Sequence, residues 1–144
     1  MSAIIHRDVL AIFDCAIADF QAEVETLKKI KTHDEYTYLH SLNVAELSVN
    51  LGRRLGFEDD MITNLGWAAL LHDIGKLHVP IDILNKAKKF SAEELAIMQS
   101  HPIEALSAFA RHQPVTIERI QRLSAAFEHH QRFDLKGYPA VHRK

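Results

Sequence analysis

The chain has 144 residues, a charged fraction of 25% and a formal net charge of −2 at pH 7. This length predicts one hydrophobic core, and the nearly balanced charge argues against bulk nucleic acid or a membrane surface as a partner. No apolar run approaches the roughly 20 residues needed to cross a bilayer, and the first residues lack a secretory pattern, so we expect a cytoplasmic protein. One cysteine, Cys15, excludes an intramolecular disulfide.

Apolar residues recur at three- and four-residue steps from about residue 4 to residue 30, which predicts a long amphipathic N-terminal helix. Such a helix is longer than average. We therefore expect part of it to pack on another subunit, forming a homodimer. The predicted division is an N-terminal helix over residues 1–32 and a second helical domain over residues 33–144.

Capping residues and glycine mark the next two helices. Thr32-His33-Asp34 supplies cap residues for a second helix that runs to about Leu55, where Gly56 ends it. Asp59 or Asp60 is expected to cap a third helix, which carries apolar residues as far as His72-Asp73.

Prolines and a capping box divide the second half of the chain. Pro80 opens a single helical turn, and Ser91 followed by Glu94 is the capping box of a fourth helix. Pro102 breaks or restarts that helix, and Pro114 opens another that ends at the paired histidines 129 and 130. No strand is predicted, so the expected fold class is all-α.

The segment LLHDIGK, residues 70–76, places a histidine and an aspartate side by side at the end of an apolar stretch. Burying this doublet is costly unless something pairs with it. Further histidines fall at predicted helix ends or beside apolar stripes: His40, His101, His129 and His130. Imidazole and carboxylate ligands without thiolate suit manganese, iron or zinc better than calcium. The pattern therefore predicts a metal site with more than one ion.

Each of these residues also has a purely structural interpretation. His40 is compatible with a hydrogen-bonded residue on a helix face, and His101 with a helix end. The pair His129-His130 suits a solvated helix terminus, where imidazolium interacts favourably with the helix dipole. Lys76 is compatible with an exposed loop lysine. The metal interpretation gains weight because all of the histidines share similar settings.

Two cations about 3.5–4 Å apart would suit phosphodiester hydrolysis, because they acidify a bridging water and neutralise the phosphoryl oxygens. Asp73 is the natural bridging carboxylate, and His72 beside it would bind one ion. This chemistry predicts a metal-bridging hydroxide as the nucleophile.

Four ordered segments resemble the HD-GYP branch of the HD metal-dependent phosphohydrolase superfamily: YLHSLNVAEL, AALLHDIGKLHVPIDIL, KKFSAEELAIMQSHP and EHHQRFDLKGYP. The resemblance runs from about Asp34 to Pro139. It implies an all-α HD-domain helical bundle that binds two or three metals, often iron or manganese. It also implies hydrolysis of cyclic di-GMP to a linear product.

Carried over by position, the resemblance implies six metal ligands: His40, His72, Asp73, His101, His129 and His130. Lys76 would face the substrate phosphate and stabilise developing charge. Tyr138 in the Gly-Tyr-Pro motif would either stack on a guanine or anchor its loop on the core. We expect two divalent transition-metal ions.

Several positions depart from the family pattern. Tyr36 stands where members with three metals carry a glutamate, and Gln131 follows the histidine pair in place of a glutamate. The family continues beyond the Gly-Tyr-Pro motif to a further metal-binding aspartate, so we expect a domain shortened at its C-terminus, with Asp134 as a candidate substitute. Two functions follow: a cyclic di-GMP phosphodiesterase, or a catalytically impaired module for signalling, nucleotide sensing or protein interaction. A phosphohydrolase for another nucleotide is a third.

Overall fold

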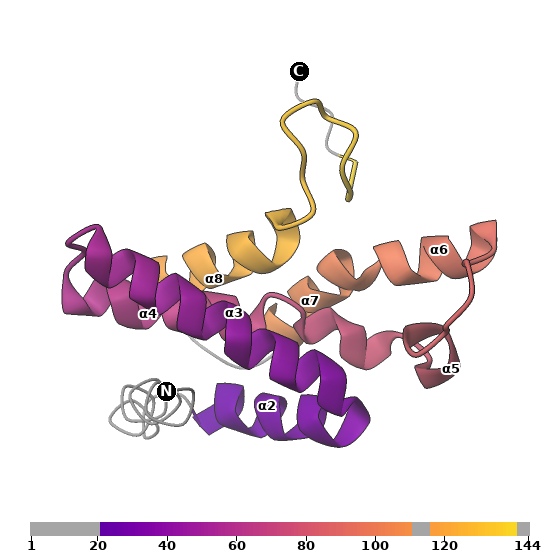
Figure 1. Cartoon of the computed structure of the whole chain (residues 1–144), viewed down its shortest axis with the longest axis horizontal. Helices are drawn as coiled ribbons and strands as arrows, with labels where there is room; N and C mark the ends of the chain where they lie inside the picture. The colour runs from indigo at the N-terminus through magenta and orange to yellow at the C-terminus, as the bar shows by residue number, and fades with distance from the viewer. Residues whose placement is uncertain (1–20, 111–115, 141–144) are drawn as a thin grey trace. The chain divides into compact units, whose positions relative to one another are not determined.

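The computed structural model describes residues 21–110 and 116–140 (Figure 1). Across these residues the secondary structure is helical, with no strand, so the all-α fold class is confirmed. The chain divides into two compact units at the bond between Leu71 and His72. No described helix combines the length and the apolar character needed to cross a membrane. The predicted division at residue 33 stays a prediction.

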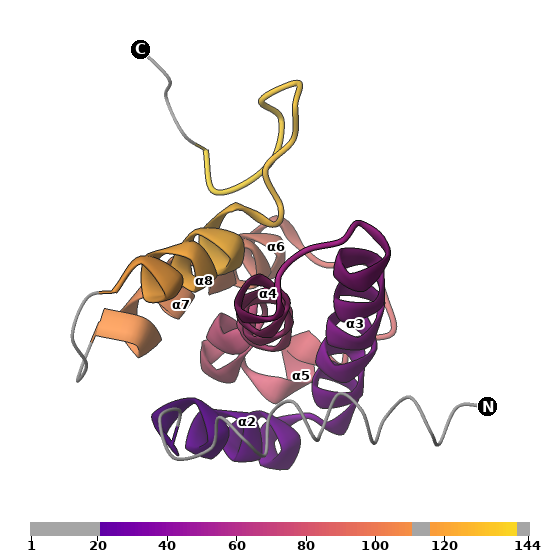
Figure 2. The same cartoon turned by 90° about the vertical axis from the view of Figure 1, so that its left-hand side faces the viewer.

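The first unit contains α2 (Gln21–His33), α3 (Glu35–Arg54) and α4 (Asp59–Leu71). The predicted N-terminal helix is described from Gln21 onward and ends at His33 rather than near residue 30. Its earlier part, with Cys15, lies outside the described residues, and its predicted subunit contact stays a prediction. The helices α3 and α4 pack against each other (Figures 1 and 2).

Local signals explain the helix boundaries of this unit. The carboxylate of Asp34 accepts a hydrogen bond from the Thr37 backbone N–H at 2.7 Å, which confirms the predicted cap of α3. Gly56 follows the end of α3 with a φ of +74°, the left-handed conformation typical of a residue that ends a helix. The predicted cap of α4 was wrong by one position, because Asp59 and Asp60 both lie inside the first turn of the helix. There their negative charges interact favourably with the helix dipole.

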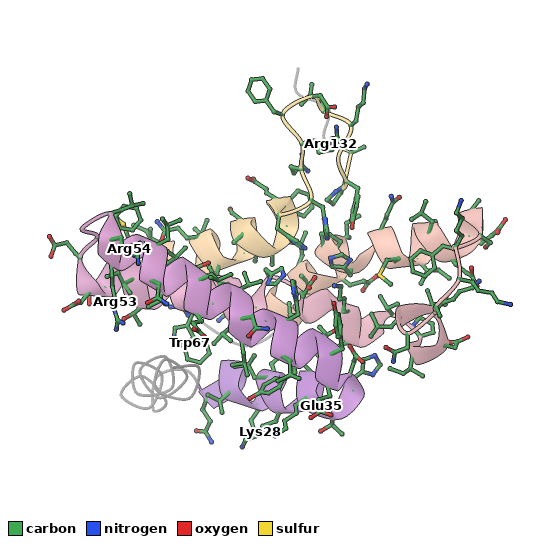
Figure 3. The ribbon with its side chains drawn as sticks, in the orientation of Figure 1. Lys28, Glu35, Arg53, Arg54, Trp67 and Arg132 are labelled. Carbon is green, nitrogen blue, oxygen red and sulfur yellow. The ribbon has the colours of Figure 1, made fainter. Side chains whose placement is uncertain are left out.

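Apolar residues of α4 dominate the core of the first unit. The side chain of Trp67, labelled in Figure 3, is fully buried (0% exposed). The last six residues of α4 are all buried: Gly66, Trp67, Ala68, Ala69, Leu70 and Leu71. Residues from α2 and α3 complete this core: Ile30, Ala45 and Val49. The helix α4 ends at Leu71, directly before His72-Asp73.

The second unit contains the 3-10 helix η1 (Ile74–His78), α5 (Ile81–Leu84), α6 (Ala92–Gln99), α7 (His101–Ala110) and α8 (Ile117–Glu128). The first turn of α7 packs on η1, and α7 also packs on α8 (Figure 2). The predicted single turn after Pro80 is confirmed as α5, and the predicted restart at Pro102 is confirmed because α7 begins at His101.

Two helix starts in this unit use side-chain caps. The predicted capping box of α6 is confirmed: Ser91 Oγ accepts from the Glu94 N–H at 3.2 Å, and the Glu94 carboxylate accepts from the Ser91 N–H at 2.6 Å. Thr116 caps α8 by accepting from the Arg119 N–H at 3.2 Å. Pro114, the predicted start of that helix, lies outside the described residues.

Candidate metal centre

Asp73 is the centre of a cluster of side-chain nitrogen atoms within the second unit. It lies directly before η1 and is 2% exposed. Its Oδ1 atom lies 3.3 Å from His101 Nε2 and 3.5 Å from His129 Nε2. Its Oδ2 atom lies 3.1 Å from His72 Nε2 and 2.8 Å from Lys76 Nζ. One buried carboxylate therefore presents each oxygen to two nitrogen atoms.

Gly75 brings the carboxylate close to α7. An alanine Cβ at Gly75 would collide with the carbonyl oxygen of His101 and would lie 2.8 Å from the backbone nitrogen of Ala105. The backbone of η1 therefore touches the backbone of α7 with no room for a side chain. This contact places Asp73, two residues earlier, opposite the imidazole of His101.

Backbone carbonyls orient two of the imidazole rings. His101 Nδ1 lies 2.7 Å from the carbonyl oxygen of Met98, and His129 Nδ1 lies 3.0 Å from that of Ala126. A carbonyl oxygen only accepts hydrogen bonds, so both Nδ1 atoms must carry the proton. In the neutral rings the lone pair is then on Nε2, the atom that faces Asp73.

The two Nε2 atoms lie only 3.2 Å from each other. A ring that already donates from Nδ1 can donate from Nε2 as well only when it is an imidazolium. Without protons, two lone pairs and a carboxylate oxygen would face one another in a buried space. A divalent cation bound between these three atoms would relieve their repulsion, as expected of a metal site.

Burial and hydrogen bonding act on the ionisable groups of the cluster. Burial by itself raises the pKa of Asp73, but the neighbouring imidazoles of His101, His129 and His72 outweigh it and hold that pKa well below its usual range. Burial, together with the charges of His129 and His101, lowers the pKa of His130 to about 4. At neutral pH, Asp73 is therefore ionised and His130 is neutral, the protonation states that metal ligation requires.

The paired histidines at the end of α8 both join the cluster. His129 is the C-cap residue of α8, and His130 is next in the chain. Single ligand atoms from Asp73, His101, His129 and His130 all lie within 4.8 Å of one another. The ring of Tyr138 is stacked on that of His130, with centroids 4.4 Å apart and an interplanar angle of 20°.

The second unit thus brings together seven residues predicted from the sequence: His72, Asp73, Lys76, His101, His129, His130 and Tyr138. His40 lies on α3 in the first unit, and its ligand role stays a prediction. Asp134 is exposed, and its carboxylate accepts two hydrogen bonds from Arg132. Arg132 is labelled in Figure 3 in the loop after α8. It does not share the group of converging ligand atoms found among the described residues.

Sequence reasoning missed three contributors to this geometry. Gly75 carried no signal beyond that of a loop glycine, because its close neighbour is about 26 residues away in the chain. Met98 and Ala126 contribute only their backbone carbonyls. Their position three residues before a histidine is the sole signal available, and it becomes meaningful only once the helices are known.

The comparisons with known proteins agree on one family. The profile of the HD domain matches residues 37–142. A cyclic di-GMP phosphodiesterase from Pseudomonas aeruginosa is 38% identical over 114 residues, which are 79% of this chain and 27% of the relative. A 3′3′-cGAMP-specific phosphodiesterase from Vibrio cholerae is 35% identical over 114 residues, 76% of this chain and 25% of the relative.

A cyclic di-GMP phosphodiesterase from Thermotoga maritima is 32% identical over 123 residues, which are 84% of this chain and 33% of the relative. The chain therefore spans a quarter to a third of the length of these relatives. No solved structure matches the chain.

Proposed function

Because the chain belongs to the HD domain family, whose fold is that of metal-dependent phosphohydrolases, we propose that it hydrolyses the phosphodiester bonds of a cyclic dinucleotide. Two of the relatives above are named for cyclic di-GMP and one for 3′3′-cGAMP. Cyclic di-GMP is accordingly the first substrate to test. The proposal concerns this chain, which covers only part of each relative.

The convergence on Asp73 carries the proposal. Two imidazole Nε2 atoms lie 3.3 Å and 3.5 Å from one carboxylate oxygen, and both rings have their Nδ1 protons engaged by backbone carbonyls. This donor set fits first-row divalent ions, with iron or manganese favoured and zinc as the next choice. We propose two ions, held by the side chains of His72, Asp73, His101, His129 and His130.

When bound, the ions would acidify a water molecule and neutralise the phosphoryl oxygens of the substrate. The residues of the chain prepare the site for this chemistry. The carbonyls of Met98 and Ala126 hold the rings of His101 and His129 with their lone pairs toward the carboxylate. Lys76 adds a positive charge 2.8 Å from Asp73, which favours an incoming phosphate. The predicted contact of Tyr138 with a nucleobase stays a prediction.

Metal content and hydrolysis measured on the same samples test the proposal. The purified chain is loaded anaerobically with Fe²⁺ or Mn²⁺, its metal is measured by elemental analysis, and cyclic di-GMP and 3′3′-cGAMP are followed by chromatography. Asp73→Asn is the test variant. Asp82→Asn is the matched control, because Asp82 is an exposed aspartate of the same unit. We expect the parent and the control to bind up to two ions and to turn over substrate, and D73N to lose both properties.

The outcomes separate the candidate functions. Metal uptake without hydrolysis of either dinucleotide would favour the non-catalytic module. Hydrolysis of a different nucleotide would change only the assigned substrate. The absence of both bound metal and turnover would overturn the proposal. His40→Ala tests the ligand predicted only from the sequence: loss of an ion would support that role, and unchanged content would remove it.

A further inference from the structure

The imidazole of His130 is held differently from its neighbours in the cluster. The rings of His101 and His129 each hydrogen-bond to a backbone carbonyl. Among the described residues, the ring of His130 forms no such bond to a carbonyl; it lies against the rings of His101, His129 and Tyr138. The most nearly parallel of these contacts is with Tyr138, at 4.4 Å and 20°. His130 therefore depends on ring packing for its orientation.

The loop after α8 returns to His130 to make this contact. The Tyr138 N–H donates to the carbonyl oxygen of His130 at 3.2 Å. The Gln131 side-chain amide donates to the carbonyl oxygen of Pro139 at 2.7 Å, a bond that a glutamate carboxylate could not donate. These two bonds close the loop, which turns back on itself after α8 (Figure 1). The backbone of the loop thus places the aromatic ring of Tyr138 against the imidazole of His130.

Gly137 permits this close return. A Cβ at Gly137 would collide with the carbonyl oxygen of His130 and would lie 2.8 Å from the Cα of Gln131. Any side chain there would push the loop away from His130, and Tyr138 with it. The adjacent glycine and tyrosine therefore act together: one allows the approach and the other supplies the ring.

We propose that Tyr138 is a positioning residue for the metal centre, whose stacked ring holds the His130 imidazole in the orientation needed for ligation. The inference rests on the proposed metal site. Tyr138 also makes an edge-to-face contact with the ring of His101, with centroids 6.1 Å apart and an interplanar angle of 82°. Tyr138 thereby limits the movement of the His130 ring, whose stacked partner it is.

Three substitutions on one loop separate the role of the ring from general effects. Tyr138→Phe keeps the ring and removes the hydroxyl, and Tyr138→Leu removes the ring while keeping an apolar side chain. Phe133→Leu is the matched control, because Phe133 is a fully exposed aromatic residue (106% exposed) of the same loop. Each variant is titrated with Co²⁺, and the visible absorption of the bound ion reports its ligand geometry.

We expect Y138L to weaken the binding of one Co²⁺ on the order of tenfold and to change its absorption, because partners that orient ligands typically contribute 10–100-fold to affinity. Y138F and F133L should stay within about twofold of the parent, since the stacked ring is retained or was never involved. Thermal unfolding of the metal-free variants shows whether any loss of affinity merely follows a loss of stability.

A double-mutant cycle with His130→Ala completes the test. If Tyr138 acts through His130, the Y138L substitution should have little further effect on Co²⁺ affinity in the H130A background. An equal effect in both backgrounds, a parent-like Y138L, or a Y138F variant as weak as Y138L would overturn the inference. Absence of Co²⁺ binding by the parent chain would overturn the proposed metal site and the inference together, whereas a parent that binds metal but hydrolyses nothing overturns only the proposed reaction.

Discussion

Replacing Gly75 with alanine should open the candidate metal centre by pushing η1 away from α7. The added methyl group would meet the carbonyl oxygen of His101 and would lie 2.8 Å from the backbone nitrogen of Ala105. Both partners are backbone atoms at the start of a helix, so neither can move without the helix. Overpacking of this kind costs about 1–3 kcal/mol, and the backbone contact favours the upper end.

Two measurable effects follow from this clash. With about 3 °C of melting temperature per kcal/mol for a chain of this size, we expect G75A to melt roughly 5–10 °C below the parent in the absence of metal. The carboxylate of Asp73 should also move away from His101. Ligation tolerates displacements of only about 0.2 Å, so metal affinity should fall at least about tenfold.

Circular-dichroism melting and a competition titration with a metal chelator measure the two effects. Gly56→Ala is the matched control, because its φ of +74° strains an alanine while nothing lies within 4 Å of the added Cβ. G56A should lose about 1 kcal/mol of stability and keep the parent's metal affinity. A G75A variant that melts with the parent and binds metal equally well would refute the close-contact argument.

Three further predictions concern single side chains. Lys76→Met should keep the metal content of the parent and lower cyclic dinucleotide turnover on the order of 100-fold, as measured by steady-state kinetics normalised to bound ions; unchanged turnover would remove Lys76 from the reaction. The hydrogen bond from Lys86 lowers the pKa of Glu94 below its usual 4.5, so this carboxylate contributes stability above pH 4.5 that is lost as the pH falls through its folded value. Glu94→Gln should therefore be less stable than the parent in urea at pH 7, with a gap that narrows below pH 4.5; a gap independent of pH would contradict this reasoning. Asp34→Ala removes the cap that accepts from the Thr37 N–H and should lower the melting temperature by about 3–6 °C, with Asp34→Ser recovering most of the loss; equal melting of D34A and the parent would count against the cap.

Much of the helical framework was predictable because its signals are local. The capping box of Ser91 and Glu94, the cap at Asp34 and the left-handed Gly56 each involve residues within a few positions of one another. Such signals act through hydrogen bonds and backbone conformations that barely depend on the rest of the fold. The same locality explains the small error at Asp59, because neighbouring aspartates at a helix start satisfy the cap and the first turn almost equally well.

Residue chemistry also identified most of the candidate ligands. A His-Asp doublet beside buried apolar residues is costly without a partner, so His72-Asp73 was informative on its own. The histidines at 101, 129 and 130 became candidates through their number and their positions at helix ends. Their convergence could not be derived from spacing, because 28 residues separate two nitrogen atoms that lie 3.2 Å apart.

The amino-acid sequence by itself determined the helical class, the positions of the caps and the chemical type of the site, since these depend on composition and on neighbours along the chain. Only the tertiary structure decided which atom of each ring faces Asp73, why Gly75 must lack a side chain, and that Tyr138 stacks on His130. Those features arise from packing between segments distant in the chain. Their geometry depends on the packing of the whole second unit, so it cannot be predicted from residues that are neighbours in the chain.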